Sequence, residues 1–106
     1  MSQRLDQLTK LHQADPTDAF CTYGIGLEYA KAGQANQAVQ WMDKTLAIDP
    51  HYCYAYYHKA KILSENAKVD QAREVLRTGI AVAEKLGTRD STHAAKEMAT
   101  LLNVLG

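Results

Sequence analysis

The chain has 106 residues, of which 46% are apolar and 23% are charged, the balance of an ordinary globular domain. Twelve basic residues match twelve acidic ones, which argues against nucleic acid or an anionic membrane as the main partner. The first residues lack the apolar core of a signal peptide, and no run approaches the roughly 18 apolar residues of a membrane helix. We therefore expect a single cytoplasmic domain.

The N-terminal residues 2–14 are expected to form a lone helix. Leu5, Leu8 and Leu11 recur every three residues, which places them on one side of a helix. Asp15-Pro16 ends this helix, because a residue before proline is pushed out of the α region. Asp15 is then expected to cap the next helix and Pro16 to be its first residue.

Two helix pairs follow, each with apolar residues at helical spacing. Their expected helices span residues 17–31, 35–48, 51–65 and 69–85. Gly26 lies inside the first of these, at a cost of about 1 kcal/mol relative to alanine, and close approach of a neighbouring helix would explain it. Gly33 supplies a left-handed stop between the helices of the first pair. A last helix runs over about 90–105, with Asp90 or Ser91 as its cap.

A shift of 34 residues superposes the first helix pair on the second. Pro16 then falls on Pro50, and the other identical matches are Tyr23 on Tyr57, Gln37 on Gln71, Ala38 on Ala72 and Ala47 on Ala81. A fixed period of this size is typical of repeat architectures. Since strand signals are absent, the sequence predicts an all-α fold.

The size of the residues at fixed places in this period resembles the tetratricopeptide repeat family. Small residues occur at Gly26, Ala38, Ala60, Ala72 and Gly79, and large ones at Tyr29, Met42, Leu63 and Leu76. The resemblance implies an all-α, right-handed α-solenoid of antiparallel helix pairs with about six helices. It divides a single domain, 1–106, into a capping helix (2–14), two repeats (17–50 and 51–86) and a second capping helix (90–105).

Three residues depart from the family pattern. Thr22 stands where a bulky residue is usual, and Thr45 where a small one is usual. Lys59 occupies a place that is normally apolar, although its long stem can lie along apolar surface with the charge in water. None of the three breaks the period.

The resemblance also implies a concave groove, lined by the first helix of each pair, that binds a peptide or a segment of a partner protein. The residues at its lining positions include Phe20, Tyr23, Leu27, Lys31, Tyr54, Tyr57, His58 and Lys61. They predict an aromatic floor with a polar end formed by Lys31, His58 and Lys61. The alternative for the aromatic residues is burial against one another and against the N-terminal helix. His58 is either a pH-sensitive donor in the groove or a solvated side chain.

Some members of the family grip acidic C-terminal peptides with a clamp of lysine, asparagine and arginine. The matching positions here hold Tyr23, Leu27 and His58, so this clamp is absent. The chain also lacks a glycine-rich phosphate loop, a nucleophile motif and metal-ligand spacing. We therefore expect a protein-binding scaffold that is not an enzyme and holds no cofactor or metal.

Self-association is the alternative function. The last helix carries more apolar residues than one face needs, namely Leu101, Leu102, Val104 and Leu105, which suggests a homodimer. Trp41 is expected near the convex side, either partly packed against a neighbour or as a contact between copies. Cys21 and Cys53 are expected to be reduced thiols, with a disulfide between them as the alternative.

Overall fold

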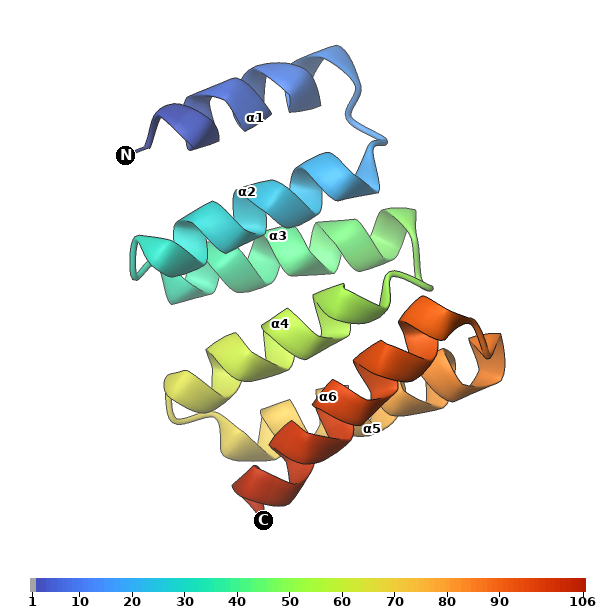
Figure 1. Cartoon of the computed structure of the whole chain (residues 1–106). Helices are drawn as coiled ribbons and strands as arrows, with labels where there is room; N and C mark the ends of the chain where they lie inside the picture. The colour runs from blue at the N-terminus through green and yellow to red at the C-terminus, as the bar shows by residue number, and fades with distance from the viewer. Residues whose placement is uncertain (1) are drawn as a thin grey trace.

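The computed structural model describes residues 2–106, and within that range the chain forms six α-helices and no strand (Figure 1). They are α1 (Gln3–Ala14), α2 (Ala19–Lys31), α3 (Ala35–Ile48), α4 (Cys53–Glu65), α5 (Val69–Leu86) and α6 (Arg89–Leu105). Each helix packs against the next along the chain, so α2 with α3 and α4 with α5 form the two expected pairs. The all-α solenoid expected from the sequence is confirmed.

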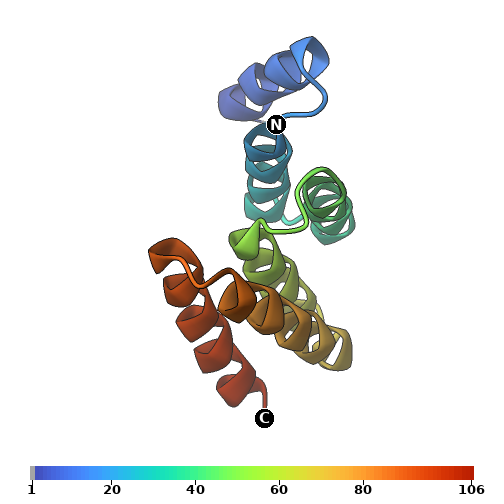
Figure 2. The same cartoon turned by 90° about the vertical axis from the view of Figure 1, so that its right-hand side faces the viewer.

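The helices stack in one direction and leave one side of the stack open. In Figure 2, α3 and α5 lie on one side, while α2, α4 and α6 follow a curved line on the other. Contacts between α2 and α4 and between α4 and α6 connect the members of this second row. The molecule is flat, with extents of 37 × 30 × 18 Å. The row of α2, α4 and α6 is the surface on which a site can form.

The two Asp-Pro steps form the corners between helices rather than helix starts. The Asp15 carboxylate accepts hydrogen bonds from the backbone N–H and hydroxyl of Thr17, at 3.1 and 2.7 Å. Asp49 accepts from the backbone N–H of His51 at 3.0 Å, one period later. Each aspartate therefore closes a local turn of the kind that competes with helix formation. The expectation that Asp15 caps α2 and Pro16 begins it was wrong.

Other side chains cap the helices that follow the corners. Asp18 caps α2 by accepting the backbone N–H of Cys21 at 3.3 Å. Thr88 caps α6, and its hydroxyl and backbone N–H exchange hydrogen bonds with Ser91 in a reciprocal capping box. The sequence expectation named Ser91 or Asp90 as the cap itself, whereas Ser91 is the third residue of the helix. Gly33 adopts the left-handed conformation expected of it, with φ of 75°.

Glycines allow neighbouring helices to approach closely inside the stack. A β-carbon on Gly26 would lie 2.9 Å from the end of Met42 and 3.4 Å from the carbonyl oxygen of Ala38. The same addition to Gly79 would meet the β-carbon of Tyr56 at 2.6 Å and the sulfur of Met98 at 2.7 Å. The shortest of these contacts are closer than side-chain packing permits, so both positions favour glycine. The close approach inferred from Gly26 is confirmed.

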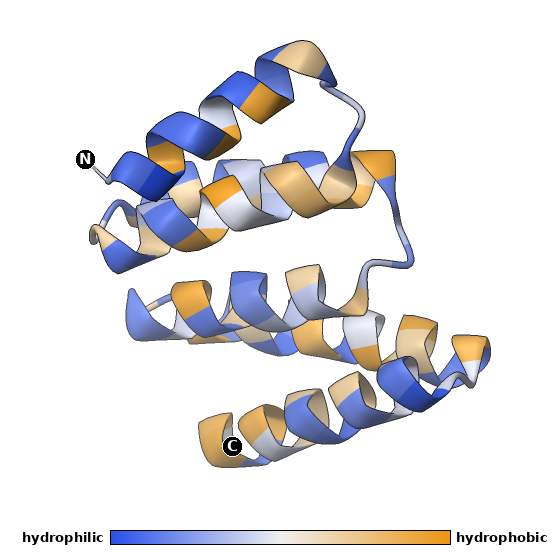
Figure 3. Cartoon of the chain, turned by 45° about the horizontal axis from the view of Figure 1, so that its top comes forward, coloured by the Kyte–Doolittle hydropathy of each residue, from blue (hydrophilic) through white to orange (hydrophobic). Residues whose placement is uncertain are grey.

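The N-terminal helix is fastened to α2 by an apolar stripe and one buried carboxylate. The hydrophobic residues of α1 lie along its side nearest α2 (Figure 3), and Leu5 and Leu8 are buried there. Glu28 is 7% exposed, accepts a hydrogen bond from the Ser2 hydroxyl at 2.9 Å and lies 3.2 Å from the Lys31 ammonium. The Ser2 hydrogen bond and then Lys31 lower the pKa of Glu28, which keeps it charged.

The two threonines that depart from the family pattern face each other between α2 and α3. Thr22 and Thr45 are fully buried, and their hydroxyl oxygens lie 2.7 Å apart. Each hydroxyl also reaches a backbone carbonyl of its own helix, Ala19 at 3.0 Å and Trp41 at 2.9 Å. The two protons make two of these three contacts at a time, when one hydroxyl donates to its carbonyl and the other donates to the first hydroxyl. The two departures therefore form one hydrogen-bonded unit.

Lys59 joins the two repeats. Its side chain is 24% exposed, and its ammonium lies 2.6 Å from the carboxylate of Asp43 on α3. The stem of Lys59 lines a hollow of about 310 Å³ together with apolar residues such as Leu46 and Leu63. The family pattern has an apolar residue here, and a lysine is tolerated because its stem packs while its charge is paired.

We predict that Thr22→Val and Thr45→Val each reduce the free energy of unfolding by about 1–2 kcal/mol, because each leaves a buried hydroxyl without its partner. The double variant should lose about 1 kcal/mol less than the sum, since the shared hydrogen bond is counted only once. Urea unfolding of the four proteins measures this coupling. Strictly additive losses would show that the two hydroxyls do not act together.

Candidate functional site

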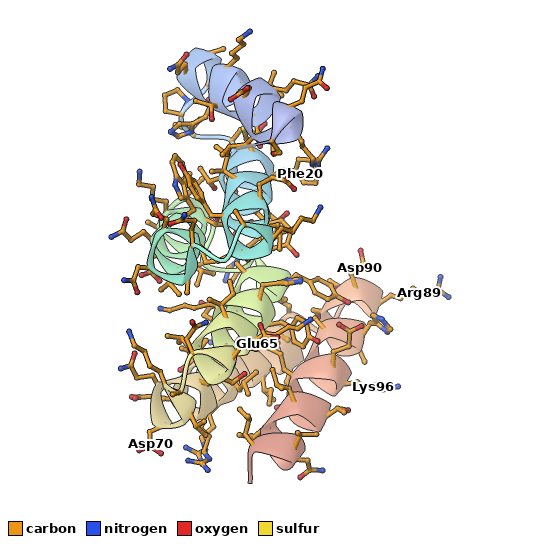
Figure 4. The ribbon with its side chains drawn as sticks, turned by 90° about the vertical axis from the view of Figure 1, so that its left-hand side faces the viewer. Phe20, Glu65, Asp70, Arg89, Asp90 and Lys96 are labelled. Atoms are coloured by element: carbon orange, nitrogen blue, oxygen red, sulfur yellow. The ribbon has the colours of Figure 1, made fainter. Side chains whose placement is uncertain are left out.

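The candidate site is the open face of α2, α4 and α6, which we call the concave groove. Phe20 of α2 projects on the same side of the ribbon as Arg89, Asp90 and Lys96 of α6 (Figure 4). Its side chain is 64% exposed although it is a large apolar residue. An exposed aromatic ring at the edge of a surface formed by three helices is typical of an interaction site.

Four tyrosines and a histidine from α2, α4 and the turn before α4 form a connected aromatic floor. The Tyr23 ring lies 4.8 Å from Tyr52 and 5.5 Å from His58, between ring centres. The Tyr57 ring meets His58 and Tyr54 edge to face, at 5.1 and 6.3 Å. Edge-to-face and offset pairs at these distances are mutually stabilising, so the floor is held in one arrangement before any partner binds.

The floor presents polar atoms as well as rings. Within residues 2–106, the only enclosed side-chain polar atom without a hydrogen bond is Nδ1 of His12. The hydroxyls of Tyr52, Tyr54 and Tyr57 therefore reach solvent. The floor combines large apolar area with polar groups at its surface, which are the properties of tyrosine-rich binding surfaces.

His58 lies at the centre of the floor and connects α4 to α2. Its Nδ1 lies 2.8 Å from the hydroxyl oxygen of Tyr23 and 3.0 Å from the carbonyl oxygen of Tyr54. Burial lowers the pKa of His58, and the nearby charge of Lys61 lowers it further, while the Tyr54 carbonyl and Glu97 act in the opposite direction. Burial likewise raises the pKa of Tyr23. Both side chains are therefore neutral at physiological pH.

The last helix forms one wall of the groove. A hollow of about 430 Å³ lies between α4 and α6 and is lined by Tyr57, Lys96, Glu97, Thr100, Leu101 and Val104. Arg73 of α5 fixes the end of this wall by donating to the carbonyl oxygens of Leu105 and Gly106, both at 2.9 Å. These hydrogen bonds hold the C-terminal end of α6 in place against α5.

The structure brings together four of the eight residues expected in the groove, namely Tyr23, Tyr54, Tyr57 and His58. Leu27 is half-buried and packs against a core formed by residues of α3 and α4. Phe20 lies exposed at the start of α2, and Lys61 is exposed on α4.

Of the expected polar end, His58 and Lys61 lie close enough for the lysine charge to lower the pKa of the histidine, whereas Lys31 is engaged within α2. Lys31 pairs with the buried Glu28, and His58 joins the aromatic floor. The charge of Lys31 is thus paired within α2.

Tyr52 and the α6 residues of the hollow were not expected in the groove. The sequence pattern predicts that α6 is a capping helix and that its leucines leave apolar surface exposed. In the structure, Leu101, Leu102 and Leu105 pack against the core formed with α4 and α5, and Val104 stays 76% exposed. If α6 is counted as the third helix in the row of α2 and α4, the repeat pattern places its residues opposite Tyr57.

The remaining residues considered at the sequence level lie away from the floor. Cys21 and Cys53 are buried free thiols. Trp41 is partly buried, packs edge to face on His12 of α1 at 5.0 Å between ring centres and carries the Lys44 ammonium 4.0 Å above its ring. Among residues 2–106, no three histidine, cysteine or acidic side chains gather closely enough to hold a metal ion. No helix in this range is long and apolar enough to span a bilayer.

Comparison with known proteins assigns the repeat to a family. A profile of the tetratricopeptide repeat family matches residues 29–86, which is more than half of the chain. The chain belongs to the tetratricopeptide repeat family. This tetratricopeptide repeat protein is also 30% identical, over 64 residues, to an uncharacterized protein of Methanocaldococcus jannaschii, a match that covers 60% of this chain and 74% of the relative.

Solved structures with this fold include chaperones of type III secretion. PcrH in complex with the chaperone binding region of PopD superposes with a TM-score of 0.87 at 19% identity, over 95% of this chain and 74% of that one. The translocator chaperone SycD of Yersinia enterocolitica gives 0.85 at 15% identity, over 95% and 68%. A tetratricopeptide repeat domain protein of Salinibacter ruber gives 0.72 at 26% identity, over 83% and 94%. At the identities of PcrH and SycD, the likeness is one of fold.

We predict that His58 makes stability depend on pH just below neutrality. Because its pKa is lowered in the fold, the unfolded chain binds more protons as pH falls through the ordinary histidine value of about 6.5. Stability should therefore be highest above this pH and decline below it. Urea unfolding between about pH 7.5 and 5.5 should show a shallower decline for His58→Asn than for the wild type.

Equal slopes for the wild type and His58→Asn would contradict the assignment of this titration to His58.

Proposed function

We propose that this protein is a non-catalytic scaffold that binds a segment of a partner protein in the concave groove. The observation that carries the proposal is the preorganised aromatic floor of Tyr23, Tyr52, Tyr54, Tyr57 and His58, which lies open beside the hollow at α6. Rigid aromatic side chains supply large contact area at little cost in conformational entropy. The structure of PcrH in complex with a region of PopD supports the proposal, because a protein of the same fold binds a partner's segment.

The charges of the groove favour a segment whose central residues are uncharged. Lys31 is paired with Glu28, and the Glu97 carboxylate lies 3.1 Å from Nε2 of His93. The floor between these pairs carries neutral tyrosines and a neutral His58. A charged residue placed among these rings would lose its hydration, and the charges of Lys61 and Glu97 act on His58 in opposite directions. Apolar and uncharged polar residues are therefore the preferred occupants.

We predict that Phe20→Asp and Val104→Asp each weaken binding about tenfold or more, because an uncompensated charge at the edge of the groove opposes an apolar segment. Both side chains are mostly exposed, so the fold should be unaffected. The measurement is fluorescence titration with peptides selected from a random display library on the wild-type protein. Thr78→Asp places the same charge on α5, on the other side of the molecule, and serves as the control.

Unchanged affinity for both groove variants, or an equal loss for Thr78→Asp, would contradict binding in the groove. Circular dichroism and unfolding curves of the three variants establish that any loss of affinity is not a loss of fold.

Self-association through the terminal helix is the second candidate function. The exposure of Val104 favours it, whereas the packing of Leu101, Leu102 and Leu105 on the core removes most of the apolar surface expected for it. A homodimer joined by this helix should appear in light scattering at high protein concentration and should be lost in Val104→Asp. A monomer under the same conditions would contradict it.

A further inference from the structure

Resting on the proposed function, we infer that Tyr23 and His58 form a fixed donor–acceptor pair that recognises the main chain of an extended partner segment. The pair joins α2 to α4 at the middle of the groove floor through a 2.8 Å hydrogen bond between the Tyr23 hydroxyl and Nδ1 of His58. The partner's backbone N–H is accepted by His58, and its backbone carbonyl is bound by the Tyr23 hydroxyl.

The neighbours of Nδ1 determine which nitrogen of His58 carries the proton. Nδ1 lies 3.0 Å from the Tyr54 carbonyl oxygen, which can only accept a hydrogen bond. A bare Nδ1 would place two acceptors against each other, so the proton is on Nδ1. The Tyr23 oxygen lies 2.8 Å from the same nitrogen, and the two oxygens share its N–H. The network thus fixes the Nδ1–H tautomer.

This tautomer leaves one acceptor and one donor free. With the proton on Nδ1, Nε2 is an unprotonated acceptor. Nε2 has no hydrogen bond within the protein and is not among the enclosed, unbonded atoms of residues 2–106, so it is accessible to a ligand. The Tyr23 oxygen already accepts from His58, which leaves its own proton available to donate. The acceptor and the donor therefore lie next to each other on the floor.

An extended main chain is the partner that matches this pair. A main chain offers one N–H and one carbonyl per residue, but inside an α-helix these groups are already bonded to each other. An extended segment leaves both groups free for Tyr23 and His58 at every residue. The nearby Glu97 carboxylate adds negative potential around the His58 ring, which favours an approaching N–H group. Because every residue other than proline supplies the same two groups, the pair fixes the path of the segment, while its side chains are selected elsewhere.

The tautomer is tested first, and without any ligand. Long-range proton–nitrogen NMR correlation distinguishes a protonated from an unprotonated ring nitrogen. We expect His58 to show a protonated Nδ1 and a bare Nε2 at neutral pH. A protonated Nε2 would overturn the inference.

Recognition is tested with peptides selected from a random display library on the wild-type protein. Each peptide is also made with single amide-to-ester replacements, which remove one backbone N–H at a time. At one position the ester should weaken binding to the wild type about tenfold, because Nε2 loses its donor. The same ester should not change the affinity of the peptide for His58→Asn. The asparagine amide can still donate from near the position of Nδ1, but it is too short to place an acceptor at the position of Nε2.

Two further variants separate recognition from folding. Tyr23→Phe keeps the ring and should lose about tenfold in affinity, whereas Tyr56→Phe removes a hydroxyl bonded to the Pro50 carbonyl outside the groove and should lose none. His58→Gln, which can place an amide oxygen near the Nε2 position, should bind more tightly than His58→Asn.

The outcomes also separate this inference from the proposed function. Peptides that bind the groove in wild type but are insensitive to every ester, to Tyr23→Phe and to His58→Asn would overturn the inference alone. The inference is equally overturned if the loss of affinity in the Tyr23 and His58 variants depends on an asparagine or glutamine side chain of the peptide, or on a basic side chain that faces Glu97. A selected peptide that binds as a helix would overturn it too. A library that yields no groove-bound peptide would overturn both.

Discussion

The fold depends on close approach between helices at positions that hold only glycine or alanine. Gly79 admits the β-carbon of Tyr56 at a distance that leaves no room for a side chain, and Gly26 admits the flexible end of Met42. Ala38, Ala60 and Ala72 are fully buried at the corresponding places. Small residues recur with a period of 34 at Gly26 and Ala60 and at Ala38 and Ala72, so the two pairs pack alike at these places and their first helices lie in one row. That row is the concave groove.

The groove is made specific by a few polar contacts between helices. The Tyr23–His58 hydrogen bond connects the floor across α2 and α4, and Arg73 holds the end of the α6 wall. Glu28 neutralises Lys31 while fastening α1 to α2. These contacts pair the charge of Lys31 and fix the rings in place. The occupant that we propose for this surface is therefore a neutral, extended segment rather than an acidic tail.

The repeat and its helices could be predicted from the sequence because their determinants are local. Periodic apolar residues, Gly33 and the recurring Asp-Pro step each act within a few residues of their own position. The precise start of α2 could not be predicted from the sequence, because the Asp15 carboxylate closes a turn instead of capping this helix. Thr22 and Thr45 look like two separate departures in the sequence, and only packing shows that they form one hydrogen-bonded pair.

The candidate site was predictable in part for the same reason. Tyr23, Tyr57 and His58 follow from the position of each residue within the repeat, and the structure brings their rings together. The contribution of α6 depends on how the last helix lies against α4, which no period in the sequence specifies. The acceptor role of His58 depends on two neighbours, one of them on another helix, and therefore needed the three-dimensional contacts.

An amide-resolved NMR map of where a selected peptide binds tests the groove most directly. Peptide binding is expected to perturb the backbone amides of Tyr23, Tyr57 and Leu101, which lie on the three helices of the groove. Perturbations confined to Leu46 and Val75, around the hollow on the α3 and α5 side, would contradict binding in the groove.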